Sequence, residues 1–246
     1  MSLPVHLVPS LAAVSAASEV TVEGDEAHHA VAVRRLRVGE RVVLTDGAGT
    51  AVTGEVASTG KRVFTVSVAE VRHEPVPAPA VTVVQALPKG ERGELAVEML
   101  TEIGAARIVP WAASRSVAVW KGERAEKSLA KWRATAREAA KQARRSWFPE
   151  VTPLASTADA LALVAAAGVA VVLHEEGTAR LGDLAIAPDG DLVVVVGPEG
   201  GLSEEEVAAF ERAGAVTVRL GGEVLRTSTA GVAAVAALLA RTPRWA

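Results

Sequence analysis

Apolar and polar positions alternate in short segments along the first 74 residues of the chain. Turn residues such as Asp46–Gly49 and Gly60 separate one segment from the next. Alternation over such short lengths predicts β-strands, and one short helix is expected between Asp25 and Arg35. The expected strands cover residues 5–8, 19–22, 40–45, 51–56 and 63–68. Several short strands at this spacing indicate a small β-barrel.

The pattern changes after a proline-rich segment, residues 75–79. Alternating prolines stiffen an extended spacer and continue neither a sheet nor a helix. We therefore expect a first domain at residues 1–74, a linker at 75–79 and a second domain at 80–246.

Strands and helices alternate in the second domain, which is typical of an α/β domain with a largely parallel sheet. The expected strands cover residues 81–87, 107–111, 169–174, 192–196 and 216–220. The expected helices cover residues 93–103, 125–146, 158–167, 204–213 and 229–241. The last helix is apolar on every side, so it must be covered on every side, which predicts a homodimer.

Two glycine-rich loops, residues 197–203 and 221–229, follow two of these strands and open onto helices. Ser203 and Glu206 form a capping-box pattern that starts a helix directly after the first loop. Either loop alone is explained by the needs of a tight turn, but the pair indicates one shared ligand site. Neither loop has the spacing of a phosphate-binding P-loop or of a dinucleotide fingerprint.

Composition narrows the class of protein further. The 246 residues are 50% hydrophobic and contain no cysteine, so the chain can bury a large core and has no disulfide framework. No apolar run approaches the length of a membrane span, and no signal-peptide pattern precedes residue 30. His28 and His29 point to different sides of a helix, and no metal site is expected. The cytoplasm is the simplest location.

The net charge is −3, yet the charge is unevenly distributed. Residues 76–150 hold thirteen Lys or Arg against eight Asp or Glu, whereas residues 151–246 hold six against twelve. A basic middle can follow a phosphate backbone, although a solvated helix face is an equal alternative from charge alone. Spacing places Arg133, Arg137, Lys141 and Arg144 on one helical stripe.

A second basic group, Arg34, Arg35 and Arg37, follows the short helix of the first domain. These arginines either compensate the dipole at the end of that helix or contact RNA phosphates.

The two glycine-rich loops and several upstream segments resemble one family. The matching segments are LPKGER at 87–92, EMLTEIG at 98–104, SRSV at 114–117, REAAKQARR at 137–145, GPEGGLS at 197–203 and LGGEVLRTSTA at 220–230. They resemble the RsmE family of the SPOUT superfamily, and the resemblance covers most of residues 85–240. It implies a PUA-like RNA-binding barrel, a SPOUT domain with a C-terminal trefoil knot, and a homodimer. The implied activity is methylation of a uridine N3 in 16S ribosomal RNA with S-adenosylmethionine.

The resemblance also implies the site residues. The residues implied to bind the cofactor are Leu173, His174, Glu175, Gly197, Pro198, Glu199, Gly200, Gly201, Leu220, Gly221, Leu225, Arg226, Ser228, Thr229 and Ala230. RNA binding adds Lys89, Arg92, Arg115 and Gln142 to the basic residues named above. Glycine-exposed backbone suits adenine, and a carboxylate such as Glu199 suits the ribose. The family often carries an arginine beside its first strand, where this chain has Pro4-Val5-His6.

Arg226 is the candidate catalytic residue, because a permanent cation can stabilise a uracil anion. The alternative is a structural ion pair of Arg226 with Glu223 or a contact with the helix terminus. No general base stands out. Two other functions stay open from the residues: ribose 2′-O methylation by the same cofactor fold, and a non-catalytic ribosome-binding protein.

Overall fold

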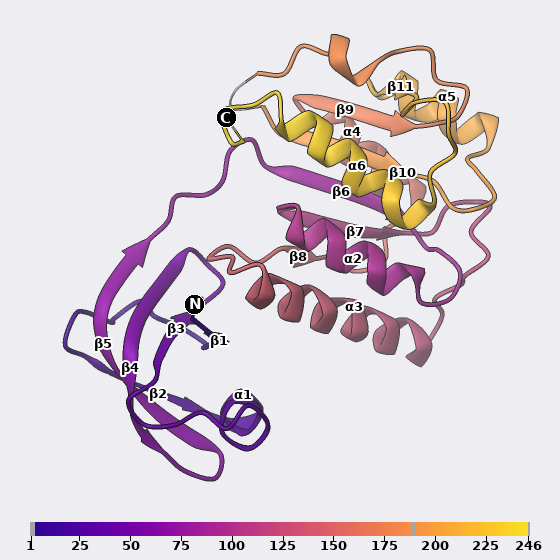
Figure 1. The fold of residues 1–246 in the computed structure, drawn as a ribbon. Helices are drawn as coiled ribbons and strands as arrows, with labels where there is room; N and C mark the ends of the chain where they lie inside the picture. The colour runs from indigo at the N-terminus through magenta and orange to yellow at the C-terminus, as the bar shows by residue number, and fades with distance from the viewer. Residues whose placement is uncertain (1–2, 188–189, 246) are drawn as a thin grey trace. The chain divides into compact units, whose positions relative to one another are not determined.

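The structure is a computed structural model that describes residues 3–187 and 190–245. The chain packs as two compact units (Figure 1). Unit 1 comprises the chain up to Val76 together with Lys141–Phe148, and unit 2 comprises Pro77–Ala140 together with the chain from Pro149 onward. The first division therefore falls inside the proline-rich segment, and a short later segment packs with unit 1.

Unit 1 is built on a five-stranded sheet with the strand order β1-β3-β4-β5-β2. The strands are β1 (Val5–Leu7), β2 (Glu19–Glu23), β3 (Arg41–Thr45), β4 (Thr50–Thr59) and β5 (Val63–His73). β1 pairs with β3 in parallel, and every other pair is antiparallel. Alternate residues such as Phe64, Val66 and Val68 are buried, because successive side chains point to opposite faces of a strand. The sheet curls into a half-barrel around this core (Figure 1).

The helix of unit 1 is less regular than the sequence predicts. α1 (Gly24–His28) continues into the π-helical segment η1 (His29–Val33). Arg35 then adopts a left-handed φ of 58°, so the chain turns sharply. Leu36 is buried after this turn, whereas Arg34, Arg35 and Arg37 are exposed.

The segment 141–148 is anchored in unit 1 by Lys141 and Trp147. Lys141 is only 9% exposed and its Nζ lies 3.0 Å from Oε2 of Glu26 in α1. Trp147 donates its indole N–H to the Glu74 carbonyl at 2.9 Å. Its ring lies against Gly49, where a Cβ would come within 2.5 Å of it, so only glycine fits there.

Unit 2 contains a six-stranded sheet with the order β11-β9-β10-β6-β7-β8. All of its strand pairs are parallel. The strands are β6 (Val81–Ala86), β7 (Arg107–Trp111), β8 (Glu150–Val151), β9 (Val169–Leu173), β10 (Leu192–Val196) and β11 (Val216–Val218). All residues of β10 are buried, as expected for a strand in the middle of a sheet covered on both faces.

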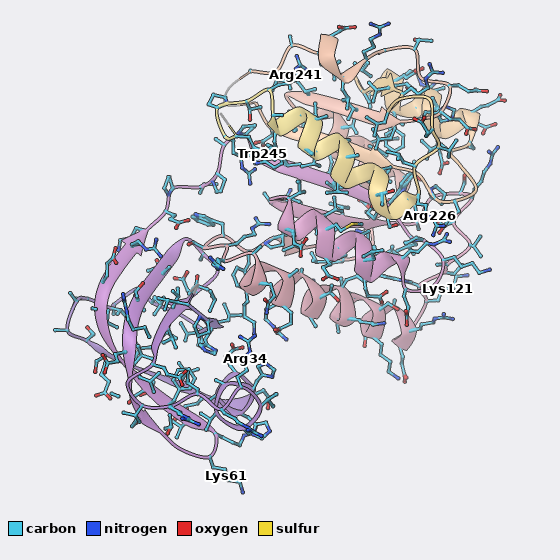
Figure 2. The ribbon with its side chains drawn as sticks, in the orientation of Figure 1. Arg34, Lys61, Lys121, Arg226, Arg241 and Trp245 are labelled. Carbon is cyan, nitrogen blue, oxygen red and sulfur yellow. The ribbon has the colours of Figure 1, made fainter. Side chains whose placement is uncertain are left out.

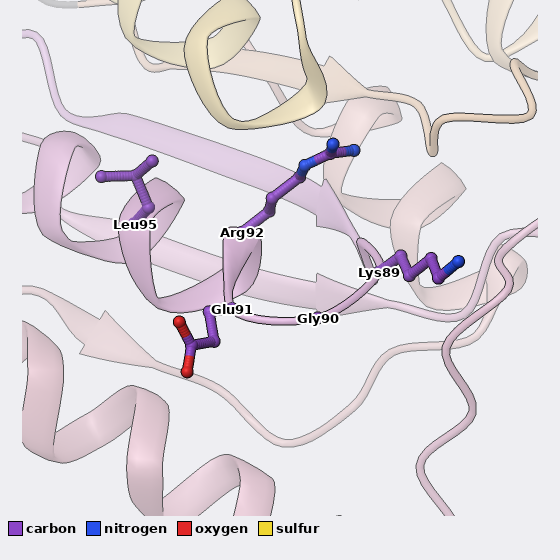
Figure 3. Close-up of a pocket in the computed structure, with 5 residues that line it drawn as sticks. All are labelled: Lys89, Gly90, Glu91, Arg92 and Leu95. Carbon is purple, nitrogen blue, oxygen red and sulfur yellow. The ribbon is translucent and has the colours of Figure 1, made fainter.

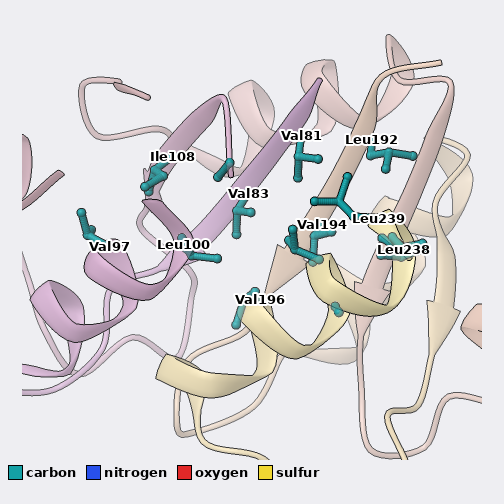
Figure 4. Close-up of a cluster of buried hydrophobic side chains, with 14 of the residues drawn as sticks. Val81, Val83, Val97, Leu100, Ile108, Leu192, Val194, Val196, Leu238 and Leu239 are labelled. Atoms are coloured by element: carbon teal, nitrogen blue, oxygen red, sulfur yellow. The ribbon is translucent and has the colours of Figure 1, made fainter. Parts of the chain in front are cut away.

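Helices cover both faces of this sheet. The helices are α2 (Arg92–Glu102), α3 (Glu123–Gln142), α4 (Thr157–Ala165), α5 (Glu204–Arg212) and α6 (Thr227–Leu239), with a short 3-10 helix η2 (Leu181–Asp183). Leu100 of α2, Leu238 of α6 and Val83 of β6 belong to one buried hydrophobic cluster (Figure 4). Phe210 of α5 and Val84, the next residue of β6, belong to a second cluster. The alternation of β6 thus separates the two cores.

α6 presents a buried face and an uncovered face. Gly231, Ala234, Val235, Leu238 and Leu239 are buried against the rest of unit 2. A Cβ at Gly231 would lie 3.2 Å from Val196 Cγ2 and 3.3 Å from Leu100 Cδ2, so a small residue lets the helix lie close to the sheet. The opposite face, which includes Ala233, Ala237 and Ala240, is exposed.

Candidate functional site

A cleft of about 920 Å³ lies at the carboxyl ends of β9, β10 and β11. Its walls are the three segments that the sequence brings to these strand ends: residues 173–176, 196–202 and 219–227. Ligands of open α/β sheets bind at this edge. Thirteen predicted cofactor residues line the cleft: Leu173, His174, Glu175, Gly197, Pro198, Glu199, Gly200, Gly201, Leu220, Gly221, Leu225, Arg226 and Ala230.

Ser228 and Thr229, which were also predicted, lie in the first turn of α6 and outside the lining of the cleft. Ser228 is 3% exposed. The Thr229 hydroxyl donates to the Arg226 carbonyl at 3.1 Å. Both residues therefore belong to the first turn of α6, beside the cleft, and do not line it.

The first glycine-rich loop is held in place by Glu206. The capping box is present: Ser203 Oγ accepts from the Glu206 N–H at 3.2 Å, and the Glu206 carboxylate accepts from the Ser203 N–H at 3.0 Å. The same carboxylate accepts from the Ser114 N–H at 2.7 Å, which brings the loop after β7 alongside. Gly200 faces this loop, and a Cβ there would lie 3.2 Å from the Arg115 carbonyl.

Thr227 joins the two glycine-rich loops. Its hydroxyl donates to the Gly197 carbonyl at 2.8 Å and accepts from Nε2 of Gln85 at 3.1 Å. Gln85 is fully buried at the carboxyl end of β6. Buried polar side chains persist where they are hydrogen-bonded, and this pair fixes the start of α6 against the end of β10.

Arg226 precedes Thr227 at the N-terminus of α6 (Figure 2). Its side chain is exposed and lines the cleft. Across residues 3–187 and 190–245, no hydrogen bond or ion pair holds the guanidinium, and none joins it to Glu223. The structure therefore offers no support for the alternative of a structural ion pair with Glu223.

Glu199, the carboxylate of the first loop, contacts the turn before α2. Both of its oxygens accept from the Lys89 N–H, at 3.2 and 3.3 Å, and Oε1 accepts from Arg92 Nη1 at 3.0 Å. Arg92 thereby enters the lining of the cleft, as does Arg115, whose Nη1 donates to the Leu202 carbonyl at 3.1 Å. Both arginines are predicted RNA contacts, and their position beside the glycine-rich loops was not expected from the sequence.

A second cavity, of about 630 Å³, adjoins the first at Arg92. It is lined by Lys89, Gly90, Glu91, Arg92 and Leu95 (Figure 3). The Lys89 and Arg92 side chains extend from this turn, and Glu91 points away from Arg92 (Figure 3).

The cleft carries an excess of acidic side chains. Six glutamates line it (Glu175, Glu176, Glu199, Glu204, Glu211 and Glu223) against four arginines (Arg92, Arg115, Arg219 and Arg226). This balance favours a ligand with positive charge over a polyphosphate. Sequence reasoning missed Glu176, Glu204, Glu211, Arg219 and Glu223. Two signals could have identified such residues: Glu204 lies in the first turn of α5, and Arg219 directly follows β11.

The predicted basic stripe is not a continuous exposed surface. α3 ends at Gln142, and Arg144 has a left-handed φ of 54°, so Arg144 lies beyond the helix. Lys141 is buried and paired with Glu26, so it is not the exposed RNA-binding cation that the sequence predicts. Arg133 donates its Nε–H to the Val151 carbonyl at 3.0 Å. Arg137 and Gln142 stay exposed.

Glu26 is a carboxylate with a perturbed pKa. Burial acts to raise the pKa, but hydrogen bonds from His6 and Lys141 and the charge of Lys141 outweigh burial and lower the pKa to about 2. His6 Nδ1 lies 3.2 Å from Glu26 Oε1. This cluster is internal to unit 1 and has a structural function there.

Among the described residues, no group of three or more His, Cys, Asp or Glu is arranged to hold a metal ion. Likewise, no helix within residues 3–187 and 190–245 has the length and apolar character needed to cross a membrane.

The fold and the cleft together define a two-domain RNA methyltransferase. The RNA methyltransferase domain family matches residues 74–239, and the RNA methyltransferase PUA domain family matches residues 22–68. The half-barrel of unit 1 is therefore PUA-like and the parallel sheet of unit 2 is SPOUT-like, which confirms the predicted fold class. The chain belongs to the ribosomal RNA small subunit methyltransferase E family, RsmE.

Relatives of this family are similar over almost the whole chain. Ribosomal RNA small subunit methyltransferase E of Mycobacterium tuberculosis is 49% identical over 228 residues, which cover 91% of this chain and 87% of the relative. The Bacillus subtilis protein of the same name is 32% identical over 90% of each chain. The Neisseria gonorrhoeae methyltransferase E, solved bound to S-adenosyl methionine, is 28% identical with a TM-score of 0.85 over 96% of this chain and 97% of that chain.

Proposed function

We propose that this protein transfers the methyl group of S-adenosylmethionine to N3 of a uridine in the 16S ribosomal RNA of the small ribosomal subunit. The observation that carries the proposal is the cleft itself, in which three loops meet beside the exposed Arg226. A ribosomal substrate implies that the protein acts in the cytoplasm.

The residues of the cleft fit this cofactor. Gly197, Gly200 and Gly201 line the cleft without side chains, so an adenine edge can approach the backbone of this loop closely. Gly201 has a left-handed φ of 71°, so glycine is favoured there for conformation as well. Glu199 lines the cleft and is the proposed partner of the ribose hydroxyls, and the acidic excess suits a sulfonium cation. When bound, S-adenosylmethionine supplies an electrophilic methyl group.

Arg226 has the chemistry that methylation of uridine N3 requires. N3 carries a proton, and its lone pair is delocalised into the ring, so loss of the proton must precede or accompany attack. The guanidinium is permanently charged and can pair with O2 or O4 of the uracil, where the negative charge develops. Arg226 has no partner among the described residues that would have to be displaced, so its donors are available to substrate.

Unit 1 and the basic residues of unit 2 are the proposed RNA-binding surfaces. Arg34, Arg35 and Arg37 surround the buried Leu36 and are all exposed, which is the arrangement that phosphate contacts need. In unit 2 the candidates are Lys89, Arg92, Arg115, Arg133 and Arg137. Gln142 at the end of α3 and Arg144 beyond the helix remain candidates, whereas the buried Lys141 does not.

The proposed functional state is a homodimer formed through the exposed face of α6. Ala233, Ala237 and Ala240 are small and apolar and lie outside the core of the subunit. Such residues let helices approach closely, and burying them removes apolar surface from water. The C-terminal trefoil knot implied by the family resemblance stays a prediction.

The proposed function is tested with labelled S-adenosylmethionine and small ribosomal subunits that lack the modification. After incubation, the RNA is digested and the labelled nucleoside is identified. We expect 3-methyluridine at a single site. A 2′-O-methylated nucleoside would instead assign the same cleft to ribose methylation, and cofactor binding without any transfer would favour the non-catalytic ribosome-binding protein.

A further inference from the structure

Glu199 and Arg92 form an ion pair, although the proposed function gives them different ligands. Glu199 is assigned to the ribose of the cofactor, and Arg92 is assigned to the RNA. In the structure, Arg92 Nη1 lies 3.0 Å from Glu199 Oε1. Oε1 already accepts from both the Lys89 N–H and Arg92, so a ribose hydroxyl that binds this oxygen competes with Arg92. The N–H that Arg92 donates to Glu199 is in turn not available to a phosphate.

Both side chains of this ion pair are exposed enough for Glu199 to exchange Arg92 for another donor. The Arg92 side chain is 41% exposed and the Glu199 side chain 26%, and ion pairs of this exposure contribute little to stability. The Lys89 N–H contacts both oxygens of Glu199. A carboxylate accepts several hydrogen bonds at once, so this backbone contact can hold Glu199 in position while another donor replaces Arg92.

Arg92 also borders the cavity beside the cleft. It lines both cavities. Lys89 lines the second cavity and, within the described residues, its Nζ has no ion-pair partner. A guanidinium released from Glu199 would therefore share this cavity with an available ammonium group, and the two cations together suit an RNA phosphate.

We propose that Glu199 exchanges Arg92 for the ribose hydroxyls of the cofactor, and that the released Arg92 binds an RNA phosphate at the cavity lined by Lys89 and Leu95. This inference rests on the proposed function. The Arg92–Glu199 pair then couples the two ligands: RNA that binds alone must break the pair, whereas RNA that binds after the cofactor finds Arg92 released.

The coupling has a defined sign and size. Binding of the cofactor increases the affinity for RNA, and RNA increases the affinity for the cofactor by the same factor, because coupling between two sites is reciprocal. Since a half-exposed ion pair is the element that is broken, we expect a factor of about two to five.

The experiment measures the affinity of the protein for unmethylated small ribosomal subunits with and without saturating S-adenosylhomocysteine, which cannot donate a methyl group. Monovalent salt is varied at constant magnesium. In the wild type, the cofactor product is expected to raise the RNA affinity about two- to five-fold and to steepen the salt dependence by about one phosphate contact. In Glu199→Gln, RNA affinity without cofactor is already raised, and the cofactor product changes it no further.

Glu150→Gln is the matched control. Arg107 and Glu150 form another half-exposed ion pair with a 3.0 Å contact, with side-chain exposures of 44% and 59%, at the amino-terminal end of β7. This variant is expected to keep the wild-type coupling. An unchanged RNA affinity in the wild type on adding the cofactor product, or coupling that persists in Glu199→Gln, would overturn the inference. If methyl transfer to the subunit is still observed, only the inference fails; if neither transfer nor RNA binding occurs, the proposed function fails.

Discussion

The hydroxyl of Thr227 donates a hydrogen bond to the carbonyl of Gly197 at 2.8 Å and so joins the start of α6 to the first glycine-rich loop. We expect Thr227→Val, which keeps the shape of the side chain and removes the hydroxyl, to weaken cofactor binding about 5- to 30-fold, because Gly197 and Gln85 both lose a buried partner. Isothermal titration with S-adenosylhomocysteine measures the effect. Thr227→Ser retains the hydroxyl and should recover most of the affinity; equal loss in both variants would assign the effect to packing.

Arg226→Ala should reduce turnover by about two orders of magnitude while cofactor affinity stays within a few-fold. The physical reason is that the exposed guanidinium is proposed to act on the uracil and has no structural partner among the described residues. Single-turnover kinetics and cofactor titration separate the two effects. Arg180→Ala, which changes an exposed arginine outside the cleft, is the control. A parallel loss of turnover and cofactor binding in Arg226→Ala would demote Arg226 to a structural role.

The ion pair of Glu26 should make stability depend on pH under acidic conditions. The pKa of Glu26 is lowered from 4.5 to about 2 in the folded protein, so the unfolded state binds the proton more tightly. The stabilisation is therefore present above pH 4.5 and is lost as the pH falls toward 2. Because Glu26 is partly exposed, we expect a contribution of about 1–2 kcal/mol.

Urea unfolding of the wild type and of Glu26→Gln at neutral and acidic pH measures this contribution. The stability difference between the two proteins should shrink as the pH is lowered. A difference that is constant across the acidic range would show that the carboxylate charge is not responsible.

Ala237→Arg should convert the proposed homodimer to a monomer, because a long charged side chain on the exposed face of α6 prevents close helix approach. Light scattering coupled to size-exclusion chromatography reports the mass of the particle. Ala162→Arg places the same side chain on the exposed part of α4 and should leave the oligomeric state unchanged. If Ala237→Arg keeps the particle mass of the wild type, the exposed face of α6 is not the dimer interface.

Arg137→Gln should weaken RNA binding and reduce the slope of log affinity against log salt by about one, if the exposed guanidinium contacts one phosphate. Lys121→Gln provides a comparison on another exposed cation, outside the predicted stripe. An unchanged slope in Arg137→Gln would leave this part of α3 as a solvated face.

Local patterns predicted the elements of the fold well. The strand Arg107–Trp111 and the run Val193–Val196 were expected where the structure has them, since buried parallel strands are continuous apolar segments. The two-residue strand β8 (Glu150–Val151) was missed because so short a segment has no periodicity. The end of α3 was placed too late, since alternating alanines and cations favour a helix up to the point where Arg144 turns.

Contacts between distant residues account for what the sequence did not predict. Lys141 and Glu26 are separated by 115 positions, and Arg92 and Glu199 by 107. No local rule connects residues so far apart, so Lys141 was read as a surface cation and Arg92 as an RNA contact alone. The cleft was predictable because its residues follow strand ends, whose positions in a parallel sheet are fixed by the fold.

The later segment of unit 1 limits how this protein can be divided. The Glu26 carboxylate takes its cation from Lys141, and the surface at Gly49 is covered by Trp147. A fragment that stops at Val76 would lose both, leaving a desolvated carboxylate without a cation and an uncovered glycine turn. The PUA-like domain is thus not contained in residues up to Val76 alone. A fusion of this domain to another enzyme must also include the segment 141–148.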